Sequence, residues 1–266
     1  MKKSISAFIL GMMLMSASQS SHALFGNAGI GDSWWQSSSA YQNNIDANRR
    51  YYRELQEKRG GSSSKKTSKA TSSKTTSTKT TTQSKKTSNA YRYSHSASVT
   101  KQVNDEMIQA LRTQVQRNGA MTPQIEQEIT RLKDVDLIGQ VRGALRSDGY
   151  DTSSMATAMA YYLVVNYGVA TQQNLATLKA HTFVKQLEAS MGEDSSLANM
   201  SNADKQRMAD MLYWGGSLMM AKYLEAQRTG NRTQMGVITR EASYTLSQMG
   251  LSTSQLKNGA NGLELR

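Results

Sequence analysis

After residue 98, apolar residues recur along the chain at a helical spacing. The first stripe stops at Asn118-Gly119, and the second starts at Thr122-Pro123, which supplies an N-cap and a proline at the first helical position. The third stripe stops at Asp148-Gly149, after which Asp151 or Thr152 can cap the next helix. The stripes consist of Val99, Val103, Met107, Leu111 and Val115; of Ile125, Ile129 and Leu132; and of Ile138, Val141 and Leu145. Because each set falls on one helical face, three amphipathic helices are predicted.

The segment MATAMAYYLVV, which starts at Met155, is apolar around most of a helical circumference. Such a helix is typically buried, so we expect it at the centre of the fold. Two later stripes predict a fifth helix that ends near Met191-Gly192 and a seventh that ends at Gly250. They consist of Ala176, Ala180, Phe183, Val184 and Leu187, and of Met235, Ile238, Ala242, Leu246 and Met249.

Between these two, Ser201 and Asp204 form a variant of the capping box at the start of a long sixth helix. Gly215 and Gly216 lie in the middle of that helix, where each glycine costs roughly 1 kcal/mol relative to alanine. The pair therefore predicts either a close approach of another helix or a kink.

The C-terminal tail SQLKNGANGLELR is rich in Gly and Asn, and it is predicted to be irregular. No segment has a convincing alternation of apolar and polar residues, so no strands are expected. The fold class is therefore all-α, with a bundle of six to seven helices over residues 99–266.

Residues 24–59 have a different character. Trp34 and Trp35 stand in a stretch rich in Gly and Ser, which cannot form a core by itself. Further along, apolar residues mark one face of a short amphipathic helix, and a lone helix of this length is marginal in water. This aromatic module must therefore pack on its own C-terminal domain, on a partner protein or on a glycan. Its predicted partner-binding residues are Trp34, Trp35, Tyr41, Ile45, Tyr52 and Leu55.

A hydrophilic tract runs from Gly60 to Asn89, and twenty-seven of its thirty residues are Gly, Ser, Thr or Lys. It cannot bury enough apolar surface to offset the entropy of ordering, so we assign residues 60–98 to a disordered linker. Its lysines offer loose, salt-sensitive contacts to anionic envelope polymers. They are Lys65, Lys66, Lys69, Lys74, Lys79, Lys85 and Lys86.

The net charge of +12 would be typical of a nucleic-acid-binding protein. From Val99 onward, however, seventeen basic residues face sixteen acidic ones. The helical domain is thus nearly neutral, and no specific nucleic-acid partner is expected.

The N-terminus has the three parts of a secretory signal: Lys2 and Lys3, an apolar run from Ile5 to Met15, and a small-residue exit at Ser21-His22-Ala23. Residues 1–23 are therefore a predicted signal peptide, and the protein is expected in the periplasm or the medium. No later stretch approaches the length of a membrane span, so no transmembrane segment is expected in the mature chain.

Candidate chemistry is sparse. The absence of cysteine excludes disulfides, thiolate metal sites and a cysteine nucleophile. His181 and Glu188 share a helical face and are a weak candidate for a catalytic proton-relay pair, although a histidine without catalytic duty explains the pattern more simply. No third ligand accompanies them, so neither a metal nor a cofactor is expected.

Three segments carry a resemblance to a known family: GYDTSSMATAMAYYLVVNYGVAT, SNADKQRMADMLYWGGSLMMAKYLEA and MGLSTSQLKNGANGLEL. They resemble an uncharacterised family of secreted bacterial proteins, a domain of unknown function, over roughly residues 138–265. The resemblance implies an exported helical domain with no assigned activity, and it transfers no catalytic residues.

Three functions remain open at this stage. The leading hypothesis is an exported interaction or structural protein of the bacterial envelope or medium, without catalytic activity, whose partner is another envelope or secreted protein. The competing hypothesis is an exported helical hydrolase of cell wall or glycan. The third is a secreted toxin or effector.

Overall fold

A computed structural model describes residues 89–117, 119–192 and 195–266. The predicted signal peptide and aromatic module, and all but the last ten residues of the predicted linker, lie outside these ranges. The described helices are α5 (Ala97–Arg117), α6 (Pro123–Asp134), α7 (Leu137–Ser147), α8 (Met155–Ala170), α9 (His181–Met191), α10 (Ser195–Ala198), α11 (Asn202–Arg228) and α12 (Arg232–Gln248). Two short strands follow, β1 (Leu256–Gly259) and β2 (Gly262–Leu265). The predicted helical fold class is thereby confirmed, with one small sheet added.

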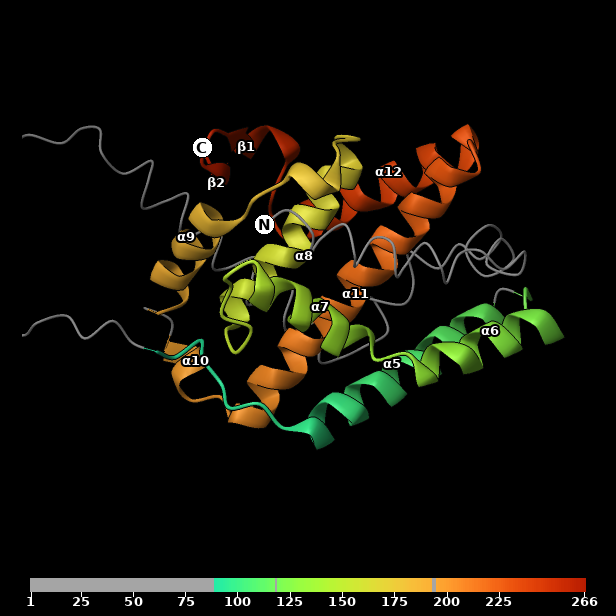
Figure 1. The fold of residues 1–266 in the computed structure, drawn as a ribbon, viewed down its shortest axis with the longest axis horizontal. Helices are drawn as coiled ribbons and strands as arrows, with labels where there is room; N and C mark the ends of the chain where they lie inside the picture. Colours follow the sequence, from blue (N-terminus) through green and yellow to red (C-terminus); the bar gives the residue numbers. More distant parts are fainter. Residues whose placement is uncertain (1–88, 118, 193–194) are drawn as a thin grey trace, which may run out of the picture.

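Helix α8 forms the centre of the bundle, as its sequence predicts. Fourteen of its sixteen residues are buried. Helices α9, α11 and α12 pack against it, and the long α11 also contacts α5 and α7 (Figure 1). A helix surrounded in this way needs apolar residues on every face, which explains the composition of the segment.

The glycine in the middle of α11 allows a close helix contact. A Cβ atom at Gly216 would lie 2.7 Å from a ring carbon of Tyr161 on α8. Helix α11 continues without interruption from Asn202 to Arg228. The predicted close approach is therefore confirmed.

The predicted helix caps are right at two positions and wrong at a third. The Thr122 side chain accepts from the Ile125 amide, and the Ser201 side chain accepts from the Asp204 amide, as expected. Helix α8, however, is capped by Ser154 rather than by Asp151 or Thr152. Asp151 accepts from the Ser153 amide at 2.9 Å, which forms a local turn before the helix begins.

The predicted fifth helix begins later than its apolar stripe suggests. Helix α9 starts at His181, with Ala180 as its cap residue, and Ala176 belongs to the 3₁₀ turn Leu175–Thr177. The Asn174 side chain accepts from the Ala176 amide at 3.0 Å, which stabilises this separate turn.

The prediction of an irregular tail is wrong. Strands β1 and β2 form an antiparallel hairpin in which Leu256 pairs with Leu265 and Gly259 with Gly262. Leu256 and Leu263 are buried, and the hairpin lies beside α9 (Figure 1). The Leu263 amide also donates to the Lys179 carbonyl at 2.8 Å. The pairing is stable because the helical bundle covers one face of the hairpin.

The last part of the predicted linker belongs to the folded domain. Tyr91 and Tyr93 are buried, and Arg92 forms an antiparallel bridge with Ser154. We call residues 89–96 the strap. The boundary at residue 98 is therefore corrected, because two buried aromatic side chains hold this segment against the bundle.

Within the described ranges, no helix combines the length and the apolar character needed to cross a membrane.

Candidate functional site

The strap is attached to the loop that precedes α8. The Tyr93 amide donates to the Ser153 carbonyl at 3.0 Å, and the Met155 amide donates to the Tyr91 carbonyl at 3.0 Å. The Tyr93 hydroxyl donates to the Thr152 carbonyl at 3.0 Å. Two backbone bonds and one side-chain bond thus fix the path of the chain just before α5.

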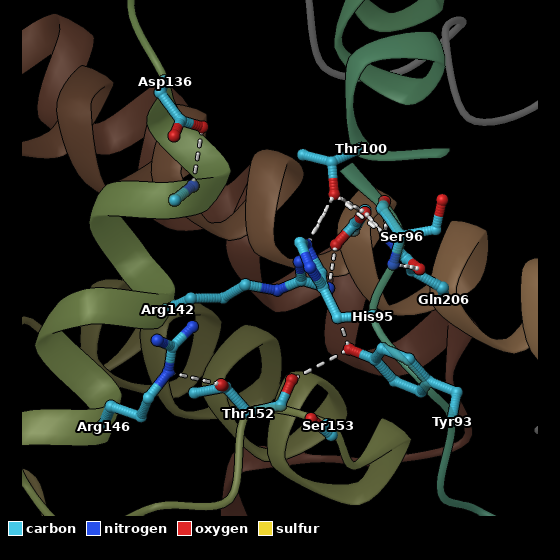
Figure 2. Close-up of polar contacts among 12 residues, drawn as sticks. Tyr93, His95, Ser96, Thr100, Asp136, Arg142, Arg146, Thr152, Ser153 and Gln206 are labelled. Carbon is cyan, nitrogen blue, oxygen red and sulfur yellow. Dashed lines mark hydrogen bonds and ion pairs between the residues drawn. The ribbon is translucent and has the colours of Figure 1, made fainter. Parts of the chain in front are cut away.

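Beneath the strap lies a group of polar side chains that we call the polar centre. It consists of Tyr93, Thr100, Arg142 and Gln206, which are labelled in Figure 2, and of Asp210. These residues come from the strap, α5, α7 and α11. An Nη2 atom of Arg142 lies 2.6 Å from Oδ1 of Asp210, and these side chains are only 3% and 0% exposed. The same Nη2 atom donates to the Tyr93 hydroxyl at 3.1 Å. The strap is therefore joined directly to a buried ion pair.

The hydroxyl of Thr100 is the junction of this network. It donates to Oδ2 of Asp210 at 2.9 Å and accepts from Nε2 of Gln206 at 3.0 Å. Nη1 of Arg142 lies 3.3 Å from the same oxygen. Gln206 also forms two hydrogen bonds with the backbone of Ser96 (Figure 2). Its Oε1 accepts from the Ser96 amide and its Nε2 donates to the Ser96 carbonyl, both at 2.7 Å.

Burial dominates the electrostatics of the polar centre. It raises the pKa of Asp210, and the Arg142 guanidinium opposes that rise together with hydrogen bonds from Thr100 and Gln206. Burial also raises the pKa of Tyr93 to about 12 and the pKa of Tyr213 well above its ordinary value. Both phenols therefore stay neutral at physiological pH, so Asp210 is the group that balances the charge of Arg142.

The surroundings of Arg142 are tightly enclosed but not fully paired. Its guanidinium lies 5.8 Å from the ring centre of Tyr93 and 5.7 Å from that of Tyr213, within the range of cation–π attraction. Among the described residues, neither Nε of Arg142 nor the hydroxyl of Tyr213 has a hydrogen-bond partner. The 2.6 Å contact of Asp210 is an ion pair without hydrogen-bond alignment. The enclosed pair of Arg142 and Asp210 can therefore hold the strap against the bundle through the Tyr93 hydroxyl.

Comparison with known protein families matches the model of a family of unknown function, DUF6683, to residues 3–266. The chain belongs to this family. The family match is much longer than the resemblance noted from the sequence, since it also includes the predicted aromatic module and linker. No curated protein and no solved structure matches the chain.

The candidate catalytic residues His181 and Glu188 lie on α9, the first at its start and the second near its end. The His181 ring stacks on Tyr150, with ring centres 4.1 Å apart and an angle of 8° between the planes. The two positions are seven residues apart in number, so the rise of an α-helix places them about 10 Å apart along the helix axis. The pKa of Arg92 in the strap is raised mainly by a hydrogen bond with Tyr91, and the charge of Glu188 makes only a small contribution.

The remaining predicted site residues lie outside the described residues. These are the six apolar residues of the aromatic module and the seven linker lysines. Within residues 89–117, 119–192 and 195–266, no cluster of three His, Asp or Glu side chains is placed to hold a metal ion.

Sequence reasoning missed the polar centre, although a signal was present. Arg142 follows Val141 directly and lies one turn after Ile138, on the apolar face of its helix. Asp210 is similarly placed between Met208 and Met211. A charged residue on an apolar helix face usually requires a buried partner of opposite charge. Arg142 and Asp210 could therefore have been considered as a pair.

Proposed function

We propose that this chain is an exported bacterial interaction protein without catalytic activity, which acts in the periplasm or the medium. In this proposal the helical domain is a stable body, and residues 24–59 are a docking element carried on the hydrophilic linker. The partner is another envelope or secreted protein.

The observation that carries the proposal is the anchoring of the strap. The buried ion pair of Arg142 and Asp210 contacts the segment at which the linker ends, through the hydrogen bond from Arg142 to the Tyr93 hydroxyl. Such an arrangement supports a role in presenting whatever lies N-terminal to the strap from a fixed point on the domain.

The charge distribution gives further support. A nearly neutral domain has little long-range attraction for polyanions, whereas the linker concentrates lysines with no acidic neighbours. The linker lysines would add loose affinity for anionic envelope polymers, and specificity would come from the aromatic module.

Crosslinking and co-purification from the native host test this proposal. The full chain is compared with a variant that lacks residues 24–59 behind an intact signal peptide, and with the paired substitution Trp34→Ala and Trp35→Ala. We expect both variants to fold and to lose the main partner.

A matched control replaces Lys65, Lys66 and Lys69 with Gln. This variant should keep the protein partner and lose only salt-sensitive retention on anionic polymers. Retention of the same partners by the chain that lacks residues 24–59 would overturn the docking role. A wall-degrading activity that disappears in Glu188→Gln with folding intact would instead establish the hydrolase.

A further inference from the structure

An exposed histidine lies at the edge of the polar centre. Nε2 of His95 is 3.2 Å from the hydroxyl oxygen of Thr100, and the ring belongs to the strap (Figure 2). The same oxygen already has Asp210, Gln206 and Arg142 as partners. His95 thus connects solvent to the junction that joins the strap to the buried ion pair.

The number of donors at Thr100 makes this contact sensitive to the charge of His95. A hydroxyl group offers one hydrogen and two lone pairs. The hydrogen is directed to Asp210, and the lone pairs face the N–H groups of Gln206 and Arg142. Neutral His95 with its proton on Nδ1 adds no further N–H group at this oxygen, whereas protonated His95 must present a third donor.

The charges around His95 work in the same direction. Although His95 is exposed, partial desolvation of its ring and the Arg142 guanidinium, with Arg146 in a smaller role, lower its pKa, while Asp210 and Asp136 oppose this effect. The positive charges come from α7, and the negative ones come from α11 and from the cap of α7. Protonation therefore places His95 against two arginines, and only one of them is held in a buried ion pair.

We propose that the strap is a pH-sensitive clasp, in which protonation of His95 loosens the contacts of residues 89–96 with Thr100 and Gln206. Mild acid thus frees the end of the linker from the domain while the helical bundle stays folded. The clasp depends on the described contacts alone and holds whether or not the proposed docking function is correct.

The sign of the effect follows from the direction of each pKa change. The closed strap binds a proton at His95 less tightly than the open strap, so falling pH favours opening below the ordinary pKa of histidine, about 6.5. Asp210 has the opposite sign, because its pKa is raised in the closed state and acid therefore favours closure. Without His95, falling pH should therefore leave the opening of the strap unchanged or should favour its closure.

Hydrogen exchange of the full mature chain tests the clasp at about pH 7.5 and about pH 5.5, with rates divided by the intrinsic rate at each pH. The informative amides are those of Tyr93 and Ser96, which donate to the Ser153 carbonyl and to Gln206. We expect their protection to fall at the lower pH, by at most about tenfold for each pH unit that separates the pKa of His95 in the two states. Amides within α8 should keep their protection.

The variant His95→Gln keeps a polar side chain that does not titrate. Its Tyr93 and Ser96 amides should have equal or greater protection at the lower pH. His181→Gln is the matched control, because His181 stacks on Tyr150 outside the polar centre, and it should respond as the unmodified chain does. A loss of protection that persists in His95→Gln, or no loss in the unmodified chain, would overturn the proposal.

Discussion

Arg142 shows how a single charged residue can connect three parts of this molecule. Its guanidinium contacts Asp210 on α11, the Tyr93 hydroxyl in the strap and the Thr100 hydroxyl on α5. A buried ion pair costs desolvation energy, so its net contribution to stability is small even when its geometry is good. Removing one partner is different, because the remaining charge is then left buried and uncompensated.

We predict that Arg142→Met lowers the free energy of unfolding by about 3–5 kcal/mol at neutral pH, because Asp210 remains buried without its counter-charge. Without Arg142 the pKa of Asp210, already raised by burial, should rise further. An acid whose pKa is raised in the folded state weakens the fold as pH rises through that pKa. The cost of the substitution should therefore shrink as pH falls towards the ordinary aspartate value of about 3.9. Urea unfolding over this pH range measures both effects.

Arg112→Met provides the matched control for this prediction. Arg112 pairs with Glu126 in a site that is 27% and 42% exposed, so its loss should cost under about 1 kcal/mol with little pH dependence. Equal costs for the two substitutions would contradict the assignment of Arg142 as the anchor of the strap.

The polar centre illustrates what the sequence could predict at the scale of residues. The positions of Arg142 and Asp210 on apolar faces are visible in the sequence, so their burial could have been expected. Their pairing could not, because sixty-seven residues separate them (142 to 210) and several other charges compete for each. Tyr93 was hidden for another reason. Tyr91 and Tyr93 follow a tract so hydrophilic that its composition predicts a linker as far as residue 98.

At the scale of elements, the helices follow from the spacing of apolar residues, and the exceptions occur where short-range patterns are weak. Four-residue strands offer too few positions for alternation to be distinguished from chance. In this chain Leu256 and Leu263 are buried, and Leu265 is partly buried, by packing against the bundle and α9, which the local sequence does not encode. The turn between the strands is Ala260-Asn261, and Gly262 begins β2. The dipeptide Asn261-Gly262 is a turn signal that the overall helical pattern masked.

Gly262 is predicted to be essential for docking of the hairpin. Its φ angle is 95°, and a Cβ atom there would lie 2.6 Å from the carbonyl oxygen of Lys179. We expect Gly262→Ala to cost about 1–3 kcal/mol from backbone strain alone, with a further loss from the steric clash. Urea unfolding measures the total, and exchange of the Leu263 amide reports whether the hairpin has left Lys179.

Gly119→Ala separates strain from steric contact in this prediction. Gly119 has a φ angle of 64° and open space around its Cβ position, so the substitution should cost roughly 1–2 kcal/mol. It should leave exchange of the Leu263 amide unchanged. If both variants expose that amide equally, the hairpin does not depend on the close approach at Gly262.

Two glycines within helices should respond in opposite directions to alanine. Gly143 on α7 is exposed with open space at its Cβ position, so Gly143→Ala should stabilise the fold by up to about 1 kcal/mol through helix propensity. Gly216→Ala should destabilise it, because the new methyl group would meet the Tyr161 ring at 2.7 Å in a close-packed contact. Thermal unfolding of the two variants under the same conditions tests the sign of each change, and a stabilising Gly216→Ala would show that Tyr161 can move away without cost.

At the scale of the whole molecule, the strap sets the boundary between the helical domain and the residues before it. The family match begins at residue 3, so it covers the part of the chain before the strap as well as the helical domain. We nevertheless expect the residues before the strap to add nothing to the free energy of unfolding of the domain. This expectation follows from the burial of Tyr91 and Tyr93, which fill space between the bundle and the loop before α8.

A pair of shortened chains tests this boundary. A chain beginning at Asn89 should have the same free energy of unfolding as a chain beginning at Leu24, because it keeps both tyrosines and the hydrogen bonds between Ser96 and Gln206. A chain beginning at Ala97 should lose about 3 kcal/mol or more, since burying one aromatic side chain contributes about 1.5–3 kcal/mol. This chain also loses the hydrogen bond from Arg142 to the Tyr93 hydroxyl. Urea unfolding of the three chains gives the comparison.

Equal stability of the two shortened chains would mean that the strap is only a passive continuation of the linker. If the chain from Asn89 is clearly less stable than the chain from Leu24, the aromatic module packs on its own domain, and the partner must bind another surface.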